Sequence, residues 1–273
     1  MKKVYAACAG FVLTAIDLIA LDQLPWYDDV YAFRANTFFS YSYFHDVDGS
    51  TSRRSYSSNN YLTSAGVGFT LSEDIDLDLD LELAQTPRQN FSFRSSALQA
   101  RYRIYNDIAA DLISVVVGVN VRGVSSKSVK DISSPYSSYC NFEMTGAVGK
   151  EYSFRESWTM RWSWLTALGM ATQGFPWIRS VGVFEGNLKD VHQGGMFAEG
   201  YFGLSGRNAV SVAYFHGWGH VQHESIDVGG FYRYHMGLWG ALRLSYSCRV
   251  FAHNYPEYEQ RGVLNYEIPF SLF

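Results

Sequence analysis

The chain has 273 residues, a formal net charge of −4 and an aromatic content of 17%, while hydrophobic residues make up 47% of it. Its mixed charges include no basic block and so lack the electrostatic pattern of a nucleic-acid-binding protein. After residue 25 there is no run of about 20 apolar residues, the length that a transmembrane helix requires. Abundant aromatic residues at a mean hydropathy of −0.11 are typical of a β-barrel with aromatic girdles outside and a polar interior.

The start of the chain has the pattern of an export signal. Two lysines precede a mostly apolar stretch from Val4 to Ile16; Asp17 interrupts that stretch, and Ala20 is the nearest cleavage candidate. An uncleaved N-terminal helix is the alternative. We predict a signal peptide over residues 1–24 and a single β-barrel domain over residues 25–273.

Residues 73–84 alternate strictly between acidic and apolar side chains. Successive side chains of a strand point to opposite faces, so one face carries Ile75 and four leucines and the other carries five carboxylates. In a secreted β-sandwich, which is the soluble alternative, the charged face would meet water. The pattern recurs along the chain with aromatic residues on the apolar side, which favours a sheet closed around a polar interior and facing lipid outside.

The same two-faced pattern predicts twelve strands, and aromatic residues on their outer faces are expected to anchor the barrel among lipid headgroups. The predicted strands lie near residues 30–44, 61–71, 73–84, 98–104, 113–122, 141–148, 158–164, 193–204, 208–217, 225–236, 238–250 and 264–272. The anchoring residues are Tyr102, Trp158, Trp162, Trp164, Tyr232 and Tyr234.

The lengths of the predicted connections alternate between long and short. The long ones lie near residues 45–60, 85–96, 123–139, 169–192 and 251–260. Long external loops and tight periplasmic turns are typical of transmembrane barrels. We therefore predict an all-β protein, a transmembrane antiparallel up-and-down β-barrel of about 12 strands, with both termini on the periplasmic side.

The chain ends in Phe273 after a run of alternating apolar residues that begins at Leu264. This pattern resembles bacterial outer-membrane β-barrel proteins. The resemblance implies export through the periplasm to the outer membrane, contact with outer-membrane lipid, and recognition of the last strand by the barrel-assembly machinery. The alternating apolar residues occupy even positions whereas Phe273 is odd, and Pro269 is the candidate for a phase shift because it cannot donate to a ladder.

The charged faces predict a lumen lined by ion pairs. If residues 73–84 and 98–104 form a hairpin through Pro87 and Arg88, Asp76 lies opposite Arg101 and Asp74 lies opposite Arg103, while Leu77 pairs with Ala100 outside. The expected lumen or constriction residues are Asp74, Asp76, Asp78, Asp80, Glu82, Arg101, Arg103, Arg122, Arg161 and Arg243, with Arg34 and Arg249 sharing the same space. Such an array either fills a narrow barrel as a salt-bridged plug or forms an eyelet that orients a polar solute.

One segment near residue 220 is rich in histidine. His216, His220, His223 and Glu224 are residue types that suit zinc, but their spacing matches no closed-site motif. We therefore predict neither a metal nor a cofactor.

A possible catalytic pair lies in the same segment. His223 and Ser225 have the His-x-Ser spacing that is similar to the dyad of outer-membrane phospholipase A and of the lipid A deacylases, barrels in which Ser attacks a lipid ester and His takes its proton. Both families follow the Ser with Asn, which is Ile226 here, and they place an orienting partner where this chain has Gly237. Asp227 is the substitute orienter, and Ser225 is expected to face the lumen, away from lipid.

These observations favour a narrow channel or binding barrel for small polar solutes over an enzyme. A lipid esterase is one alternative. Another is a structural or adhesion barrel that acts through residues 45–60, 123–139 and 169–192. Cys140 and Cys248 lie far apart in the sequence and are expected to be free.

Overall fold

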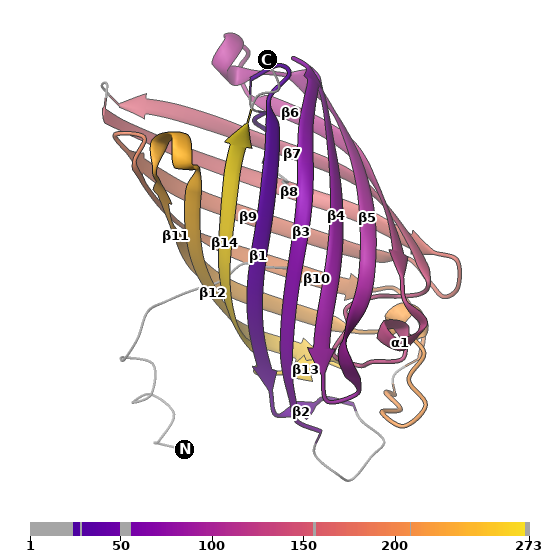
Figure 1. The fold of residues 1–273 in the computed structure, drawn as a ribbon. Helices are drawn as coiled ribbons and strands as arrows, with labels where there is room; N and C mark the ends of the chain where they lie inside the picture. The colour runs from indigo at the N-terminus through magenta and orange to yellow at the C-terminus, as the bar shows by residue number, and fades with distance from the viewer. Residues whose placement is uncertain (1–23, 28, 50–55, 155–156, 208, 271–273) are drawn as a thin grey trace, which may run out of the picture.

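The computed structural model describes residues 24–27, 29–49, 56–154, 157–207 and 209–270, and shows a closed antiparallel barrel of twelve strands (Figure 1). A separate two-stranded ribbon of β2 (Asp46–Val47) and β13 (Pro256–Glu257) lies at one end. The barrel strands are β1 (Phe33–Phe44), β3 (Ser58–Ser72), β4 (Ile75–Thr86), β5 (Gln89–Tyr105), β6 (Ser114–Val124), β7 (Cys140–Phe154), β8 (Trp158–Ala171), β9 (Trp177–Leu188), β10 (His192–Gly203), β11 (Glu224–His235), β12 (Ala241–His253) and β14 (Gln260–Phe270). The predicted fold class and strand number are confirmed.

The last strand closes the barrel against the first. The β1–β14 ladder runs from Phe33 opposite Phe270 to Tyr43 opposite Gln260, with Arg34 opposite Pro269 and no shift of register. Pro269 therefore does not change the phase of β14 as far as Phe270. Phe273 lies outside the described residues, so its role in barrel assembly stays a prediction.

The two ends of the barrel differ in their connections. At the loop end, the lower end in Figure 1, the strands are joined by residues 45–57, 87–88, 125–139, 172–176, 204–223 and 254–259. At the turn end, residues 73–74, 106–113, 155–157, 189–191 and 236–240 join them. The loop end also carries α1 (Ser126–Val129), and the short 3-10 helices η1 (Asp107–Ala109) and η4 (Gly237–Trp239) lie at the turn end. Among the described residues, no helix is long and apolar enough to cross a membrane.

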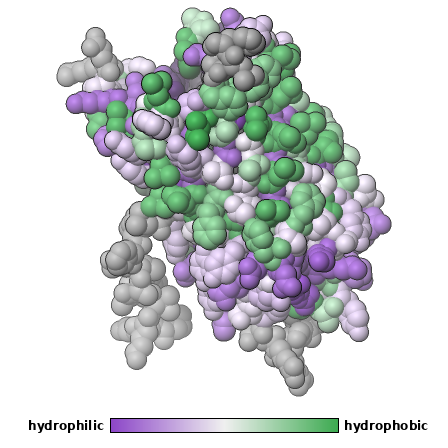
Figure 2. Space-filling view, viewed as in Figure 1, coloured by the Kyte–Doolittle hydropathy of each residue, from purple (hydrophilic) through white to green (hydrophobic). Residues whose placement is uncertain are grey.

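The outer wall of the barrel is apolar and banded by aromatic rings, as a surface in contact with lipid requires. Phe33 stacks between Phe69 and Phe270 near the turn end, and Tyr41 lies against Tyr61 toward the loop end. On the face seen in Figure 2, hydrophobic residues gather over the upper and middle part, and hydrophilic residues gather toward the loop end. The six predicted anchors, Tyr102, Trp158, Trp162, Trp164, Tyr232 and Tyr234, are all exposed on the outside.

The alternating acidic strand is β4, and its two faces separate as predicted. Asp76 and Asp80 are completely buried in the lumen, whereas Leu79 and Leu81 on the outer face are each 49% exposed. The strand begins at Ile75 rather than at residue 73, because residues 73–74 form the turn that precedes it.

The predicted long connection over residues 85–96 is wrong. A turn of only two residues, Pro87 and Arg88, joins β4 to β5, and residues 89–96 already belong to β5. Apart from Phe91 and Phe93, the side chains of residues 89–96 are polar, so the stretch shows too little alternation to predict a strand. Phe91 and Phe93 point outward and mark the edge of the apolar belt.

The predicted loop over residues 169–192 is also wrong, because it contains β9. The inner face of β9 includes Val181 and Val183 beside Arg179 and Glu185, and its outer face includes Ser180, Gly182 and Gly186, so the two faces differ too little in polarity to show a clear alternation. The neighbouring strand supplies the missing apolar cover: a Cβ on Gly182 would lie 3.0 Å from the Trp164 ring, which lies over the glycine on the outside. Trp164 of β8 thus covers part of the outer face of β9.

The strand predicted at residues 208–217 does not exist among the described residues of that stretch, which lie in the connection between β10 and β11. Val210 and Val212 would face lipid on such a strand, but they are buried in a cluster at the loop end, while Tyr214 is 83% exposed. The apolar residues of this stretch do alternate, but they pack into this internal cluster and not against lipid. Because one true strand, β9, was missed and one false strand was predicted, the predicted number of twelve strands remains correct.

Two further expectations concern the termini and the cysteines. Residues 1–23 of the predicted signal peptide lie outside the described residues. Cys140 and Cys248 form no disulfide, as expected.

Candidate functional site in the barrel lumen

The first lumenal ion-pair cluster forms around β4 near the turn end. Arg34 Nη2 donates to Asp76 at 2.9 Å and to Asp78 at 2.7 Å, and Arg101 also binds Asp76. Gly68 on β3 makes room for this contact, since a Cβ there would lie 2.6 Å from Arg34 Nε. The predicted pairing of Asp76 with Arg101, and of Leu77 with Ala100 outside, is the observed register.

The second cluster centres on Glu82 at mid-lumen. Arg122 Nη1 donates to Glu82 at 2.8 Å, and Ser95 Oγ donates to it at 2.7 Å. Arg94 lies 3.8 Å from the same carboxylate, and Arg122 also lies 3.9 Å from Asp80. One carboxylate therefore collects two guanidinium groups from β5 and β6.

The third cluster lies toward the loop end. Arg249 donates to Asp227 at 2.6 and 2.8 Å and lies 2.9 Å from Glu259, which also accepts from Arg261 at 2.8 Å. Burial alone would raise the pKa of Glu259, but Arg261 and Arg249 lower that pKa to about 2. Glu259 is therefore ionised at any physiological pH.

The connection between β6 and β7 folds into the lumen and reaches the Glu82 cluster. Tyr136 donates its hydroxyl to Glu82, and its ring lies under the guanidinium groups of Arg94 at 5.2 Å and Arg122 at 5.6 Å. Burial and then the charge of Glu82 raise the pKa of Tyr136 to about 12, so its hydroxyl stays protonated and remains a donor. The backbone of this connection is held by Trp218, whose indole donates to the Ser134 carbonyl at 2.8 Å.

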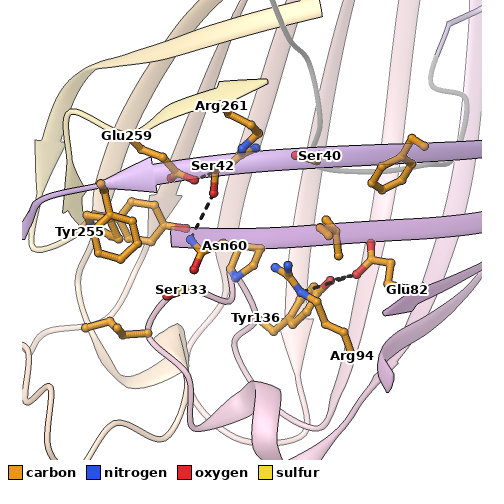
Figure 3. Close-up of a pocket in the computed structure, with 16 residues that line it drawn as sticks. Ser40, Ser42, Asn60, Glu82, Arg94, Ser133, Tyr136, Tyr255, Glu259 and Arg261 are labelled. Atoms are coloured by element: carbon orange, nitrogen blue, oxygen red, sulfur yellow. Dashed lines mark hydrogen bonds and ion pairs between the residues drawn. The ribbon is translucent and has the colours of Figure 1, made fainter. Parts of the chain in front are cut away.

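Pro135 and Tyr136 separate two cavities in the loop-end half of the lumen. The first cavity, shown in Figure 3, holds about 600 Å³ of unfilled space, part of it open to solvent, and extends from Glu82 and Arg94 to Glu259 and Arg261. The second holds about 500 Å³ on the same basis. The residues that line the second cavity are Asn120, Arg122, Pro135, Tyr136, Asn141, Glu143, Trp177, Arg179 and Tyr201.

An apolar cluster narrows the lumen beyond these cavities. Trp218 and Val210 from the β10–β11 connection are fully buried there against Phe44 and Ile132. Because the cluster combines residues from several connections, it ties the loops to one another across the loop end.

At the turn end, residues 24–27 enter the barrel. The Trp26 indole donates to Asp107 at 2.9 Å, and Arg161 lies over the Trp26 ring at 5.0 Å. Tyr27 lies under both Arg101 and Arg103, at 4.9 and 5.0 Å. This short segment therefore occupies the turn-end mouth of the lumen.

The wall beneath this segment is adapted to it. Val116, Ala147, Leu165 and Ala167 face inward on β6, β7 and β8 and form an apolar patch against which Tyr27 packs. Gly149 leaves room for the chain, since a Cβ there would lie 2.7 Å from Pro25 and 2.9 Å from Trp26. The inner wall of a transmembrane barrel is usually polar. The inward apolar residues of this patch are an exception, because they pack against Tyr27 inside the lumen.

Most of the predicted lumen residues lie inside the barrel. Asp76, Asp78, Asp80, Glu82, Arg101 and Arg122 are buried there. Arg161 pairs with Glu151 at 2.6 Å, and Arg243 lies 4.0 Å from the centre of the Phe231 ring.

Two predicted residues lie at the turn-end rim. Asp74 lies in the turn before β4 with its side chain 55% exposed, so it does not line the lumen. Arg103 lies 3.9 Å from Asp74, as the predicted pairing of these two residues requires.

The geometry around His223 does not form an esterase dyad directed at lipid. His223 and Ser225 are buried inside the barrel, and the His223 Nδ1 hydrogen bond goes to the Val221 carbonyl at 2.9 Å. Both oxygens of Asp227, the proposed orienter, accept from Arg249. His216 and His220 are exposed, so they do not join His223 in one ligand set.

Several lumenal residues were not predicted. Arg179 and Glu185 lie on β9, whose weak alternation did not predict a strand. Tyr136 lies in a loop, where no periodic signal exists. Glu143 and Glu199 occupy inward positions of β7 and β10. Their alternation with outward residues is a sequence signal that predicts them as lumen residues.

Comparisons with known proteins identify the fold. No protein-family model matches the chain, and no curated protein matches it. An outer membrane channel of Pseudomonas putida F1 is similar in structure, with a TM-score of 0.63, 9% sequence identity, and coverage of 94% of this chain and 100% of that one. The NanC porin has a TM-score of 0.52 at 11% identity, with coverage of 85% and 97%. The chain has the β-barrel fold of bacterial outer-membrane proteins.

Proposed function

We propose that the protein is a narrow outer-membrane channel that passes or binds small polar solutes. The observation that carries this proposal is the distribution of charge in the lumen: every barrel strand except β3, which has no charged residue, contributes a charged side chain to the interior. Burying an ion pair costs desolvation that apolar residues would avoid. An interior kept charged at this cost is suited to contact with water and polar solutes.

The path through the lumen has three narrow points. The apolar cluster around Trp218 lies at the loop end, Tyr136 lies between the two cavities of the loop-end half, and residues 24–27 occupy the turn end. A solute that crosses must pass all three, so we propose a small conductance governed by movement of these segments. Long loops face outward in barrels of this kind, so the loop end is the external entrance.

Ion selectivity tests the channel. Asp78→Asn combined with Asp80→Asn removes two lumenal carboxylates and leaves Arg34, Arg101 and Arg122 with fewer counter-charges. We expect the reversal potential of the refolded full chain in planar bilayers, measured under a salt gradient, to shift toward anion selectivity. Asp74→Asn at the exposed turn is the matched control and should leave the reversal potential unchanged. A folded barrel that carries no current at any applied voltage would contradict the proposal that the protein is a channel.

A further inference from the structure

One connection at the turn end differs from the others in its polarity. Residues 236–240 read Met-Gly-Leu-Trp-Gly and contain no charged side chain, whereas each of the other four turns contains at least one aspartate or glutamate. The central residues of this turn form η4, the orange coil between β11 and β12 in Figure 1. Leu238 is 96% exposed and Trp239 is 74% exposed. Two large apolar side chains that project from an uncharged turn indicate a contact with something other than water.

Contacts with β14 hold this turn on the outside of the barrel. The Tyr266 hydroxyl donates to the Trp239 carbonyl at 2.6 Å. Tyr266 lies on the same face of β14 as Ile268, which is 38% exposed on the outer wall. The backbone of Gly240 packs against the same strand, since a Cβ there would collide with the Glu267 carbonyl oxygen. The turn therefore lies against the outer wall and not over the mouth of the lumen.

The neighbouring strand shows that the apolar wall reaches the level of this turn. Ala241, directly after the turn, pairs with Glu267 of β14. β14 continues toward the turn end beyond this pair, and its outward residues Ile268 and Phe270 are each 38% exposed. The Phe270 ring stacks on the Phe33 ring at 5.4 Å. The turn is therefore continuous with a surface that faces lipid, and the boundary of such a surface with water is where tryptophan is enriched.

The turn at residues 106–113 provides a contrast at the same end. Ile108 and Leu112 are 61% and 83% exposed there, but the same turn carries Asp111, which is also exposed. Insertion of these apolar residues would bring a carboxylate toward the lipid, where a charge is costly. Among the described residues of the turn end, only the turn at residues 236–240 combines exposed apolar side chains with the absence of charge.

We propose that residues 236–240 insert into the lipid leaflet at the turn end and anchor this side of the barrel. Leu238 lies among the acyl chains, and the Trp239 indole lies at their boundary with the headgroups, where its N–H donates to lipid oxygens. The partner is a phospholipid surface, because the turn continues a wall that already faces lipid. The inference goes beyond the channel proposal and holds whether or not the lumen conducts.

Quenching of Trp239 fluorescence by brominated phosphatidylcholine tests the anchor in the refolded full chain. Bromine atoms on the acyl chains quench an indole on contact, so only rings within the lipid lose emission. The chain has 7 tryptophans, and the emission of Trp239 is the difference between the unmodified chain and Trp239→Phe. We expect brominated vesicles to remove about half or more of this difference emission, relative to vesicles of ordinary phosphatidylcholine.

A matched control places a tryptophan in a charged turn at the same end. Glu73 is exposed in the turn at residues 73–74. In Glu73→Trp, made in the Trp239→Phe background, the added emission should be quenched by aqueous acrylamide and not by brominated lipid.

A second pair of variants tests the insertion of Leu238, each measured against its own Trp239→Phe counterpart. Leu238→Asp should draw the turn into water and lower the quenching of Trp239 by brominated lipid about twofold. Leu112→Asp changes another exposed leucine, in the turn that already carries Asp111, and should leave this quenching unchanged. Heat-modifiable gel migration verifies that each variant folds.

Two results would overturn the anchor. Difference emission that brominated lipid leaves intact is one: quenching by acrylamide would then place the turn in water, and quenching by neither agent would mean that a second copy or another protein covers it. Equal quenching in Leu238→Asp and the unmodified chain is the other. Neither result depends on current through the lumen, so the channel proposal is tested separately.

Discussion

His223 illustrates how one buried side chain can carry a pH response. Its ring stacks on Tyr255 at 5.2 Å and lies near Tyr201 and Trp218, and burial lowers its pKa to about 4, with Arg249 adding to that effect. The ordinary histidine pKa is about 6.5. His223 is therefore neutral in the folded barrel under conditions where it would be charged in the unfolded chain.

This difference predicts a loss of stability in acid. Between pH 6.5 and about 4 the unfolded chain binds a proton that the folded chain does not, so the free energy of unfolding falls as the pH falls through this window. The contribution of His223 is of the order of 3 kcal/mol. His223→Phe keeps a ring in place and should flatten the dependence, measured by urea unfolding in detergent between pH 7 and 4.

Other lumenal acids titrate in the same experiment, so the comparison is the difference between the two curves. If the difference in unfolding free energy between His223→Phe and the unmodified chain is the same at every pH, His223 does not contribute. His216→Phe, at an exposed position in the same connection, is the matched control and should follow the unmodified chain.

Larger segments show how local sequence and long-range packing combine. The β6–β7 connection contains no periodic signal, yet it positions Tyr136 against Glu82 because backbone contacts from the β10–β11 connection hold it: the Trp218 and Gly219 amides donate to the Tyr136 and Ser137 carbonyls. Such contacts join residues about 80 positions apart in the sequence, so no pattern within one segment predicts them.

Residues 24–27 act as an internal closure at the turn end, and this role can be tested by removing their rings. Trp26→Ala combined with Tyr27→Ala deletes the contacts with Asp107, Arg101, Arg103 and Arg161 and exposes the inward apolar patch. We expect a several-fold increase in mean bilayer current, because the segment then leaves the mouth of the lumen more often.

The matched control replaces two aromatic residues that lie outside the lumen. Tyr214 and Tyr258 are 83% and 73% exposed, and changing both to Ala should leave the current unchanged. An equal current from the Trp26→Ala, Tyr27→Ala variant and the unmodified chain would show that the segment does not limit passage.

The barrel as a unit is defined by its apolar belt, and the position of each outward residue along the strand sets its depth. On β1, Thr37 lies halfway between Phe33 near the turn end and Tyr41 toward the loop end, and it pairs with Ala65 on β3. Ala65 in turn pairs with Leu81 on β4. Leu81 therefore lies near the bilayer midplane.

This depth predicts an asymmetric response to charge. Leu81→Arg should lower the free energy of unfolding in lipid vesicles by about 2–4 kcal/mol, whereas Leu71→Arg, close to the turn end, should cost about 0–1 kcal/mol. Both leucines are outward and similarly exposed, at 49% and 43%, so they are a matched pair. Reversible denaturant unfolding in vesicles measures both, and equal costs would contradict the assigned depth.

The alternation of side chains determined the fold class, the outward anchors and the register of β4 against β5, because a period of two residues is a local property that the chain carries whatever surrounds it. The alternation did not predict β9, where part of the apolar cover comes from the neighbouring strand, as Trp164 covers Gly182. It also predicted a false strand where Val210 and Val212 alternate but pack into an internal cluster. The placing of Tyr136, of residues 24–27 and of the cavity around Asn120 depends on contacts between residues far apart in the sequence. Those contacts exist only once the barrel is closed.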